Sequence, residues 1–107
     1  MTAYNVAKHS VRTWSSRSFA TPTMGVAVAA IYLFDEREKR VGTISFFPTT
    51  LGADQPPAVL SGDRIELRFL LLAQKYEDTI QMLASGKKVR VFYNDAYDAG
   101  LEYVPVS

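Results

Sequence analysis

The feature that most constrains this chain is a change of hydrophobic period within residues 64–93. Residues 64–69 alternate charged and apolar side chains, which predicts a strand with one face against a core. From residue 69 to residue 84 the apolar positions recur at helical spacing, which predicts an amphipathic helix. Residues 88–93 alternate again, so the sequence predicts a strand, a helix and a strand in succession.

Further strands are predicted on both sides of this unit. Residues 26–34 are almost wholly apolar and are expected to pair with residues 41–47 as a hairpin across the charged stretch 35–40. Pro48 is expected to end the second strand, because proline cannot donate a ladder hydrogen bond. We expect a loop of about twelve residues to follow Pro48, and a short last strand over residues 101–104.

The expected fold is one mostly-β domain of the α+β class over residues 1–107. Residues 1–24 are interpreted as an N-terminal strand, around residues 4–13, and an irregular extension, and residues 25–107 as a β-β-β-α-β-β core. A helix between the third and fourth of five strands is similar to the element order of the OB fold, a small partly open barrel. We therefore expect a five- to six-stranded antiparallel barrel or strongly curved sheet with one helix. An open antiparallel sheet packed on one helix is the alternative.

Composition excludes several classes of function. The chain has 107 residues, a formal net charge of +1, no cysteine and one histidine, His9. It therefore has no disulfide, thiolate zinc site, iron–sulfur cluster or multi-histidine metal site. The carboxylates Glu77 and Asp78 are adjacent on the predicted helix and diverge, and the glycines are isolated, so we expect neither an enzyme nor a cofactor.

The apolar runs are too short to cross a membrane as a helix. The run over residues 24–34 is about half of the roughly 20 residues that a spanning helix needs. Residues 1–22 lack the basic tip and apolar stretch of a secretory signal. We therefore expect a cytoplasmic protein with no membrane partner.

One candidate ligand site combines phenols and carboxylates near the C-terminus. Its predicted residues are Tyr93, Asp95, Tyr97, Asp98 and Tyr103. Aromatic rings attract ammonium groups and carboxylates neutralise them, so the expected ligand is a small cationic molecule or a basic peptide. Metal binding is not expected, because the spacing does not match an EF-hand loop.

A second candidate site would bind single-stranded nucleic acid. Its predicted residues are the outward-facing members of the two alternating strands, Arg64, Arg68, Lys88, Arg90 and Phe92. Arginine and lysine would contact phosphates, and an aromatic ring would stack on a base. Glu66 lies between the two arginines of the first strand and opposes this interpretation.

The two ends of the chain carry opposite charge. Residues 1–34 contain Lys8, Arg12 and Arg17 without an acid, whereas residues 91–107 contain three acids without a base. Charge-complementary ends and exposed sheet edges favour self-association. We therefore expect a small binding or interaction module that pairs with itself as a homodimer or with another protein. Small-molecule binding and single-stranded nucleic-acid binding are the alternatives.

Overall fold

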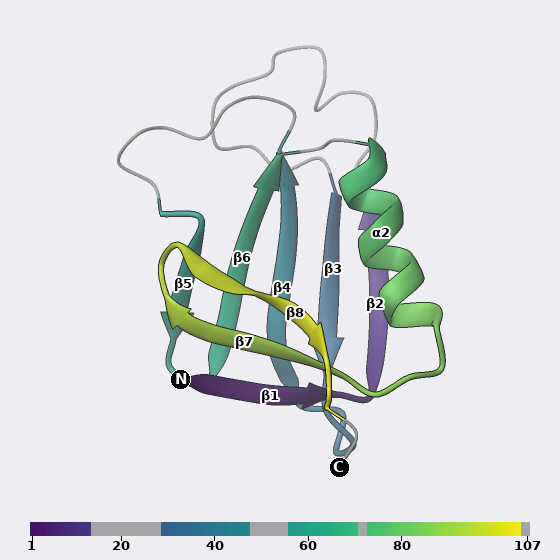
Figure 1. Cartoon of the computed structure of the whole chain (residues 1–107), viewed down its shortest axis with the longest axis horizontal. Coiled ribbons are helices and arrows are strands. Elements are labelled where there is room, and N and C mark those ends of the chain that lie inside the picture. The colour runs from purple at the N-terminus through teal and green to yellow at the C-terminus, as the bar shows by residue number, and fades with distance from the viewer. Residues whose placement is uncertain (14–28, 48–55, 71–72, 106–107) are drawn as a thin grey trace.

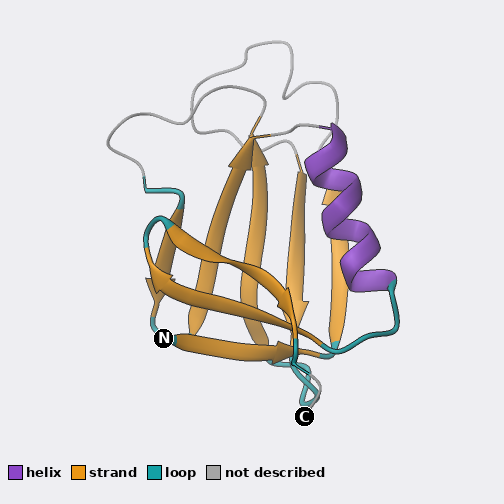
Figure 2. Cartoon of the chain, in the orientation of Figure 1, coloured by secondary structure: helices purple, strands orange, loops and turns teal. Residues whose placement is uncertain are grey.

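The computed structural model of the chain describes residues 1–13, 29–47, 56–70 and 73–105. These residues form eight strands and one helix (Figures 1 and 2), which confirms the expected mostly-β α+β class. In chain order the elements are β1 (Thr2–Val6), β2 (Lys8–Thr13), β3 (Ala29–Phe34), β4 (Arg40–Phe47), β5 (Ala58–Ser61), β6 (Arg64–Leu70), α2 (Ala73–Ala84), β7 (Val89–Asp95) and β8 (Asp98–Tyr103).

The strands belong to two sheets. The five-stranded sheet has the order β2-β3-β4-β6-β5, and the three-stranded sheet has the order β1-β7-β8. Strands β4 and β6 run parallel, whereas all other neighbours are antiparallel. The three-stranded sheet and α2 cover the same face of the five-stranded sheet, the face toward the viewer in Figure 1.

The described residues do not form the expected antiparallel barrel, because both of their sheets are open. The predicted N-terminal strand is interrupted at Ala7, so that β1 pairs with β7 and β2 pairs with β3. Residues 2–13 are therefore built into both sheets and are not an extension. The alternative of one antiparallel sheet is also wrong, because β6 inserts parallel to β4.

The expected loop after Pro48 contains a strand that the sequence did not indicate. Residues 48–55 lie outside the described residues, but Ala58–Ser61 form β5 and pair with β6 across the turn at Gly62. The predicted hairpin of β3 and β4 is confirmed, although residues 26–28 of its first strand also lie outside the described residues. This hairpin carries a register shift beside Leu33 and Phe34.

The helix α2 ends as the sequence predicts. Its last residue is Ala84, and Gly86 adopts a φ of 78°, a left-handed conformation that glycine reaches without a Cβ clash. The amide of Ser85 donates to the carbonyl of Met82 at 3.3 Å, which tightens the last turn. No helix in the described part of the chain has the length and apolarity needed to cross a membrane.

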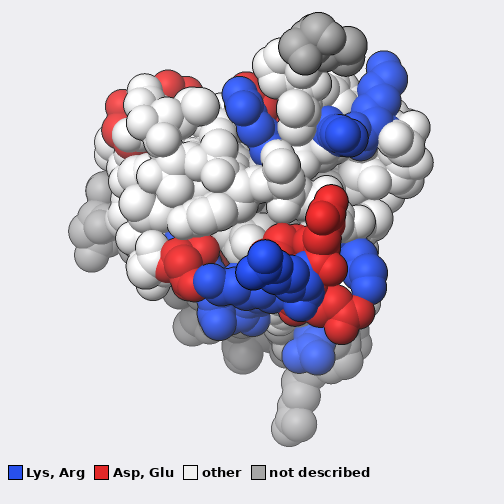
Figure 3. Space-filling view, turned by 90° about the horizontal axis from the view of Figure 1, so that it is seen from below, with Lys and Arg blue, Asp and Glu red and all other residues white. Residues whose placement is uncertain are grey.

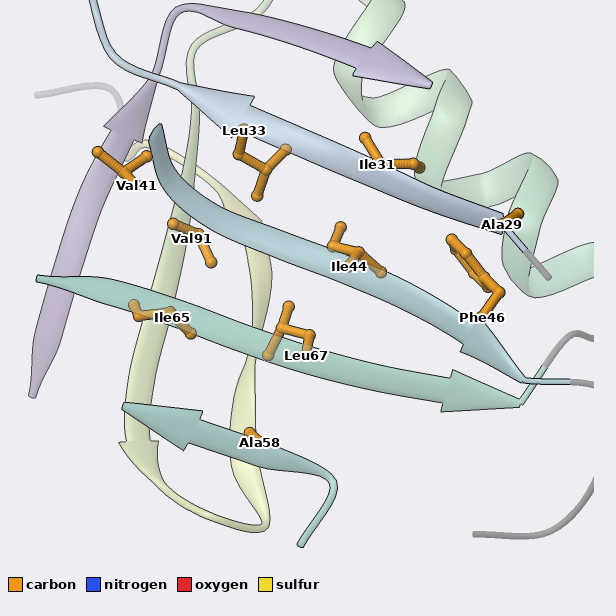
Figure 4. Close-up of a cluster of buried hydrophobic side chains, with 10 residues drawn as sticks. All are labelled: Ala29, Ile31, Leu33, Val41, Ile44, Phe46, Ala58, Ile65, Leu67 and Val91. Atoms are coloured by element: carbon orange, nitrogen blue, oxygen red, sulfur yellow. The ribbon is translucent and has the colours of Figure 1, made fainter. Parts of the chain in front are cut away.

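The core lies between the two layers (Figure 4). Its buried cluster comes mainly from β3, β4 and β6 and contains Ala29, Ile31, Leu33, Val41, Ile44, Phe46, Ala58, Ile65, Leu67 and Val91. Val91 belongs to β7, so the crossing sheet contributes directly to this cluster. Tyr76 of α2 packs edge-on against Phe46 with ring centres 5.1 Å apart, which fixes the helix over the sheet.

Candidate functional site

The predicted cation-binding residues are spread along the β7–β8 hairpin. Tyr93 packs against the core, whereas Tyr97 is 85% exposed at the hairpin turn. The amide of Tyr97 donates to Asp95 Oδ1 at 2.8 Å, and Asn94 Nδ2 donates to Asp98 Oδ2 at 3.0 Å. The carboxylates of Asp95 and Asp98 therefore accept hydrogen bonds from within the hairpin turn and stabilise it.

Tyr103 lies far from the other members of that set. It ends β8, five residues beyond Asp98 and hence about 17 Å away along the strand. Its ring contacts the Lys87 ammonium, which lies 5.2 Å from the ring centre. The structure therefore does not bring the five predicted residues around one ligand-sized space.

The predicted nucleic-acid residues are divided between the two sheets. Arg64 and Arg68 lie on β6 of the five-stranded sheet, whereas Arg90 and Phe92 lie on β7 and Lys88 precedes β7. Arg90 Nε donates to Glu102 Oε1 at 2.5 Å, so this cation is already neutralised. Arg64 and Arg68 share one surface of β6, whereas Arg90 and Phe92 share a surface of β7 in the other sheet.

The surface that Arg64 and Arg68 share is the face of the five-stranded sheet opposite the core. Alternation and register place Tyr32, Glu66 and the cations of three strands, β2, β4 and β6, on it. We call it the arginine face and define it by Arg12, Tyr32, Arg40, Arg64 and Arg68. It points away from the viewer in Figure 1, because the three-stranded sheet and α2 cover the other face.

Tyr32 lies at the centre of the arginine face between two guanidinium groups. Arg12 Cζ is 5.7 Å and Arg40 Cζ is 5.6 Å from the centre of the Tyr32 ring, within the range of cation–π contacts. Arg40 Nε is buried without a hydrogen-bond partner among the described residues. Arg68 donates one terminal N–H to the carbonyl of Pro56 at 2.8 Å. These contacts hold planar cations in place over the sheet.

Few acidic side chains lie on the arginine face to neutralise its cations. Glu66 is its one acid, and none of the ion pairs among the described residues involves Glu66 or the four arginines. Three of the chain's acids, Asp95, Asp98 and Glu102, lie instead on the three-stranded sheet. The net charge of +1 therefore conceals a separation of charge between the two sheets.

Ion pairs between turns close one end of the sheet, where acidic and basic side chains interleave in the view from below (Figure 3). Lys8 Nζ bonds to Glu38 Oε1 at 2.6 Å, and this hydrogen bond holds the pKa of Glu38 below its usual value. The hydrogen-bonded pair of Lys39 and Asp63 lowers the pKa of Asp63 and raises the pKa of Lys39.

Among the described residues, four strands are at the edge of a sheet: β1, β2, β5 and β8. Only two of these edge strands carry strong charge of one sign. Strand β2 contains Lys8 and Arg12, and strand β8 contains Asp98 and Glu102. The opposite charges of the chain ends therefore lie on two different sheet edges.

The free edge of β8 presents the main chain of alternate residues. The amide of Val104 donates to the carbonyl of Lys88 at 2.9 Å, so these two residues form a hydrogen-bonded pair in the antiparallel ladder. Such pairs alternate, so Glu102 and Gly100 also bond to β7. Ala99, Leu101 and Tyr103 consequently direct their amides and carbonyls to the free edge.

The same alternation, followed from strand to strand across the five-stranded sheet, shows which residues of β2 present their main chain to its free edge. The amide of Arg68 donates to the carbonyl of Pro57 at 2.8 Å, so the intervening β6 residues, Ile65 among them, bond to β4. The registers β6–β4, β4–β3 and β3–β2 then place Ser10 toward β3. His9 and Val11 therefore direct their amides and carbonyls outward.

Two of the described cavities contain none of the predicted cation-binding residues. One of about 340 Å³ lies where the β1–β2 turn meets the end of α2, and it is lined by Lys8, His9, Lys87 and Lys88 among others. Another of about 270 Å³ lies between α2 and β8 and includes Met82, Phe92 and Leu101.

Within the described ranges no group of three or more histidine, acidic or cysteine side chains is arranged to hold a metal ion. The chain matches no protein-family model, no curated protein and no solved structure. The residues predicted from the sequence did not include Arg12, Tyr32 and Arg40, which the structure places on a common surface. The alternation of Lys8, Ser10 and Arg12 was the available signal, but it indicates a shared face only once β2 is known to pair with β3.

Proposed function

We propose that the protein is a small interaction module whose copies associate head to tail, with β2 of one copy paired antiparallel to β8 of the next. The observation that carries this proposal is the opposite charge of these two free edges. Among the described residues Arg12 and Asp98 are in no ion pair, whereas Lys8 and Glu102 would exchange their present partners, Glu38 and Arg90, on association. An unpaired strand is a ready template for another strand, and complementary charge selects which strand it accepts.

One register satisfies both the charges and the hydrogen bonds. Placing Gly100 of one copy opposite Ser10 of another puts Asp98 opposite Arg12 and Glu102 opposite Lys8. The same register puts Ala99 opposite Val11 and Leu101 opposite His9. These are the residues whose amides and carbonyls point outward, so each such pair exchanges two hydrogen bonds.

The side chains on the other face also match. Val11 is 44% exposed on the core side of β2, and Leu101 and Ala99 pack at the margin of the core on β8. Joining the two edges would cover Val11 with Ala99 and continue the apolar face of one copy into the next.

Pairing between like edges is disfavoured by charge. A symmetric β8–β8 pair with Ala99 opposite Leu101 places Asp98 opposite Glu102, and a symmetric β2–β2 pair with His9 opposite Val11 places Lys8 opposite Arg12. Like charges directly opposite each other destabilise a sheet. The head-to-tail contact uses two different surfaces, so it produces a ring or an open chain of copies, with the dimer as its smallest unit.

Light scattering on a sizing column, at several protein concentrations and two salt concentrations, tests the association. We expect the mass to rise with concentration at low salt and to fall when salt is added, because salt screens exposed charge pairs. A monomeric mass at every concentration in low salt would reject the proposal.

Charge exchange identifies the edges. The variants Lys8→Glu/Arg12→Glu and Asp98→Lys/Glu102→Lys should each be monomeric, because each gives both edges one sign. Mixing the two variants should restore association, since acidic β2 then meets basic β8. The matched control Arg37→Glu/Arg64→Glu changes the net charge equally away from both edges and should leave association intact. Failure of the mixture to associate would assign the contact to other surfaces.

A further inference from the structure

We propose that the arginine face binds single-stranded nucleic acid, a second function that shares Lys8 and Arg12 with the association of copies. The cations on this face come from three strands, β2, β4 and β6, and the aromatic ring at its centre comes from β3. The phosphates of a strand would contact the cations, and its bases would stack on the planar groups.

The cations form two rows across the sheet. Lys8, Phe34 and Arg40 are register neighbours, and Arg64 lies beside them on β6. Arg12 and Arg68 belong to a second row four residues along, about 13 Å away. Tyr32 lies between the rows, and Glu66 shares this middle row on β6. A bound strand that passes over Tyr32 would have positive charge on both sides and a ring beneath it.

The planar groups favour a single strand over a duplex. Bases inside a duplex are already stacked, whereas unpaired bases present open faces to tyrosine rings and guanidinium planes. Arg12 and Arg40 already lie against the Tyr32 ring, so three planar groups are gathered on this part of the face. An acidic protein would use the charge of this face but not the stacking.

The assignment differs from the sequence prediction in its residues. Arg64 and Arg68 stay in the site, whereas Lys88, Arg90 and Phe92 belong to the other sheet. Arg12, Tyr32 and Arg40 take their place. No ion pair among the described residues involves these arginines, which leaves their charge available.

Fluorescence anisotropy with a labelled oligothymidylate of about 12 nucleotides tests the site. For a single strand, each phosphate contact contributes about 0.7 to the magnitude of the slope of log K against log salt. The variant Arg40→Gln/Arg64→Gln should therefore lower the slope of log K against log salt by about 1.4. The control Lys75→Gln/Lys87→Gln removes the same charge from the opposite side and should change neither affinity nor slope.

Substitution of Tyr32 separates stacking from charge. Tyr32→Leu should weaken binding about five- to 100-fold, because a stacked base is lost, with the salt slope preserved. Tyr32→Phe retains the ring and should bind like the parent chain, which controls for a folding defect. Circular dichroism of each variant verifies the fold.

Three outcomes would overturn the proposal. One is no binding of the oligothymidylate at low salt, and another is equal loss of affinity in the lysine control and the arginine variant. The third is equal or tighter binding of a duplex of the same length, of polyglutamate or of anionic phosphatidylserine vesicles, which would assign the face to charge alone.

Discussion

Gly42 lies at a position in β4 where neighbouring strands of the same sheet leave no room for a side chain. A Cβ built on Gly42 would lie 2.9 Å from the carbonyl oxygen of Ile65 and 3.3 Å from Leu33 Cδ1. The first neighbour is the backbone of the parallel strand β6, which cannot move without disturbing the β4–β6 ladder. The position therefore requires glycine because of close packing, and its φ angle imposes no such requirement.

The substitution Gly42→Ala should lower the free energy of unfolding by about 1–3 kcal/mol, the usual range for overpacking a core. Urea unfolding followed by circular dichroism measures this loss. Gly100→Ala is the matched control, because its added Cβ would meet the Phe92 ring at an ordinary 3.7 Å. Equal stability of the two variants would show that β4 and β6 separate easily.

The ion pair of Lys39 and Asp63 gives stability a defined pH dependence. The folded pKa of Asp63 is below its usual value, so the stabilisation is complete above that usual value and disappears as the pH falls through the folded pKa. The folded pKa of Lys39 is raised, so its share persists until the pH rises through that pKa. The same acid-side dependence applies to Glu38 beside Lys8.

Asp63→Asn should therefore reduce the loss of stability between neutral pH and about pH 3. Thermal unfolding of both chains across this range measures the difference. The effect should be small, because both side chains of the pair are more than half exposed. An unchanged pH profile would mean that the Lys39–Asp63 pair does not persist in solution.

At the scale of elements, the edge strand β2 offers a test that leaves its own sheet intact. The amide of Val11 points away from β3, so proline at this position removes an outward donor without removing a ladder bond. Proline is tolerated on edge strands for this reason. Val11→Pro should abolish head-to-tail association while retaining the melting temperature to within a few degrees.

Ser10→Pro provides the contrasting variant. The amide of Ser10 bonds toward β3, so proline there should destabilise the five-stranded sheet itself. Sizing with light scattering and thermal unfolding distinguish the two variants. If Val11→Pro unfolds like Ser10→Pro, the assignment of outward and inward residues on β2 is wrong.

At the scale of the whole molecule, the proposed contact would join the three-stranded sheet of one copy to the five-stranded sheet of the next. Arginine faces would then repeat along an assembly, and a long nucleic-acid strand could contact several of them. Linked contacts of this kind raise affinity without new chemistry. On short strands association would compete with nucleic-acid binding for Arg12 and Lys8, whereas on long strands the repeated faces would couple the two.

Val11→Pro should consequently bind an oligothymidylate of about 12 nucleotides at least as tightly as the parent chain, but bind a strand several times longer with reduced cooperativity. Titrations of both strand lengths by anisotropy measure the difference. The Tyr32→Leu variant is the counterpart, because it should lose affinity for both lengths. Equal cooperativity of Val11→Pro and the parent chain on long strands would show that head-to-tail association does not contribute to nucleic-acid binding.

Local pattern was sufficient for several elements. Helical spacing of apolar residues identified α2, alternation identified β6 and β7, and Gly86 indicated the end of the helix. Each of these signals depends on contacts within one segment, or on the backbone freedom of one residue. The charge separation between the chain ends was equally visible in the sequence.

Tertiary structure alone decided which segments became neighbours. The break at Ala7, the short strand β5 and the parallel pairing of β4 with β6 depend on contacts between distant residues, which no local period records. Strand pairing also places Arg12, Tyr32, Arg40 and Arg64 on one face of the five-stranded sheet, whereas Arg90 lies in the three-stranded sheet. Side-chain alternation fixes the faces of a strand, but only its partners determine which residues share a surface.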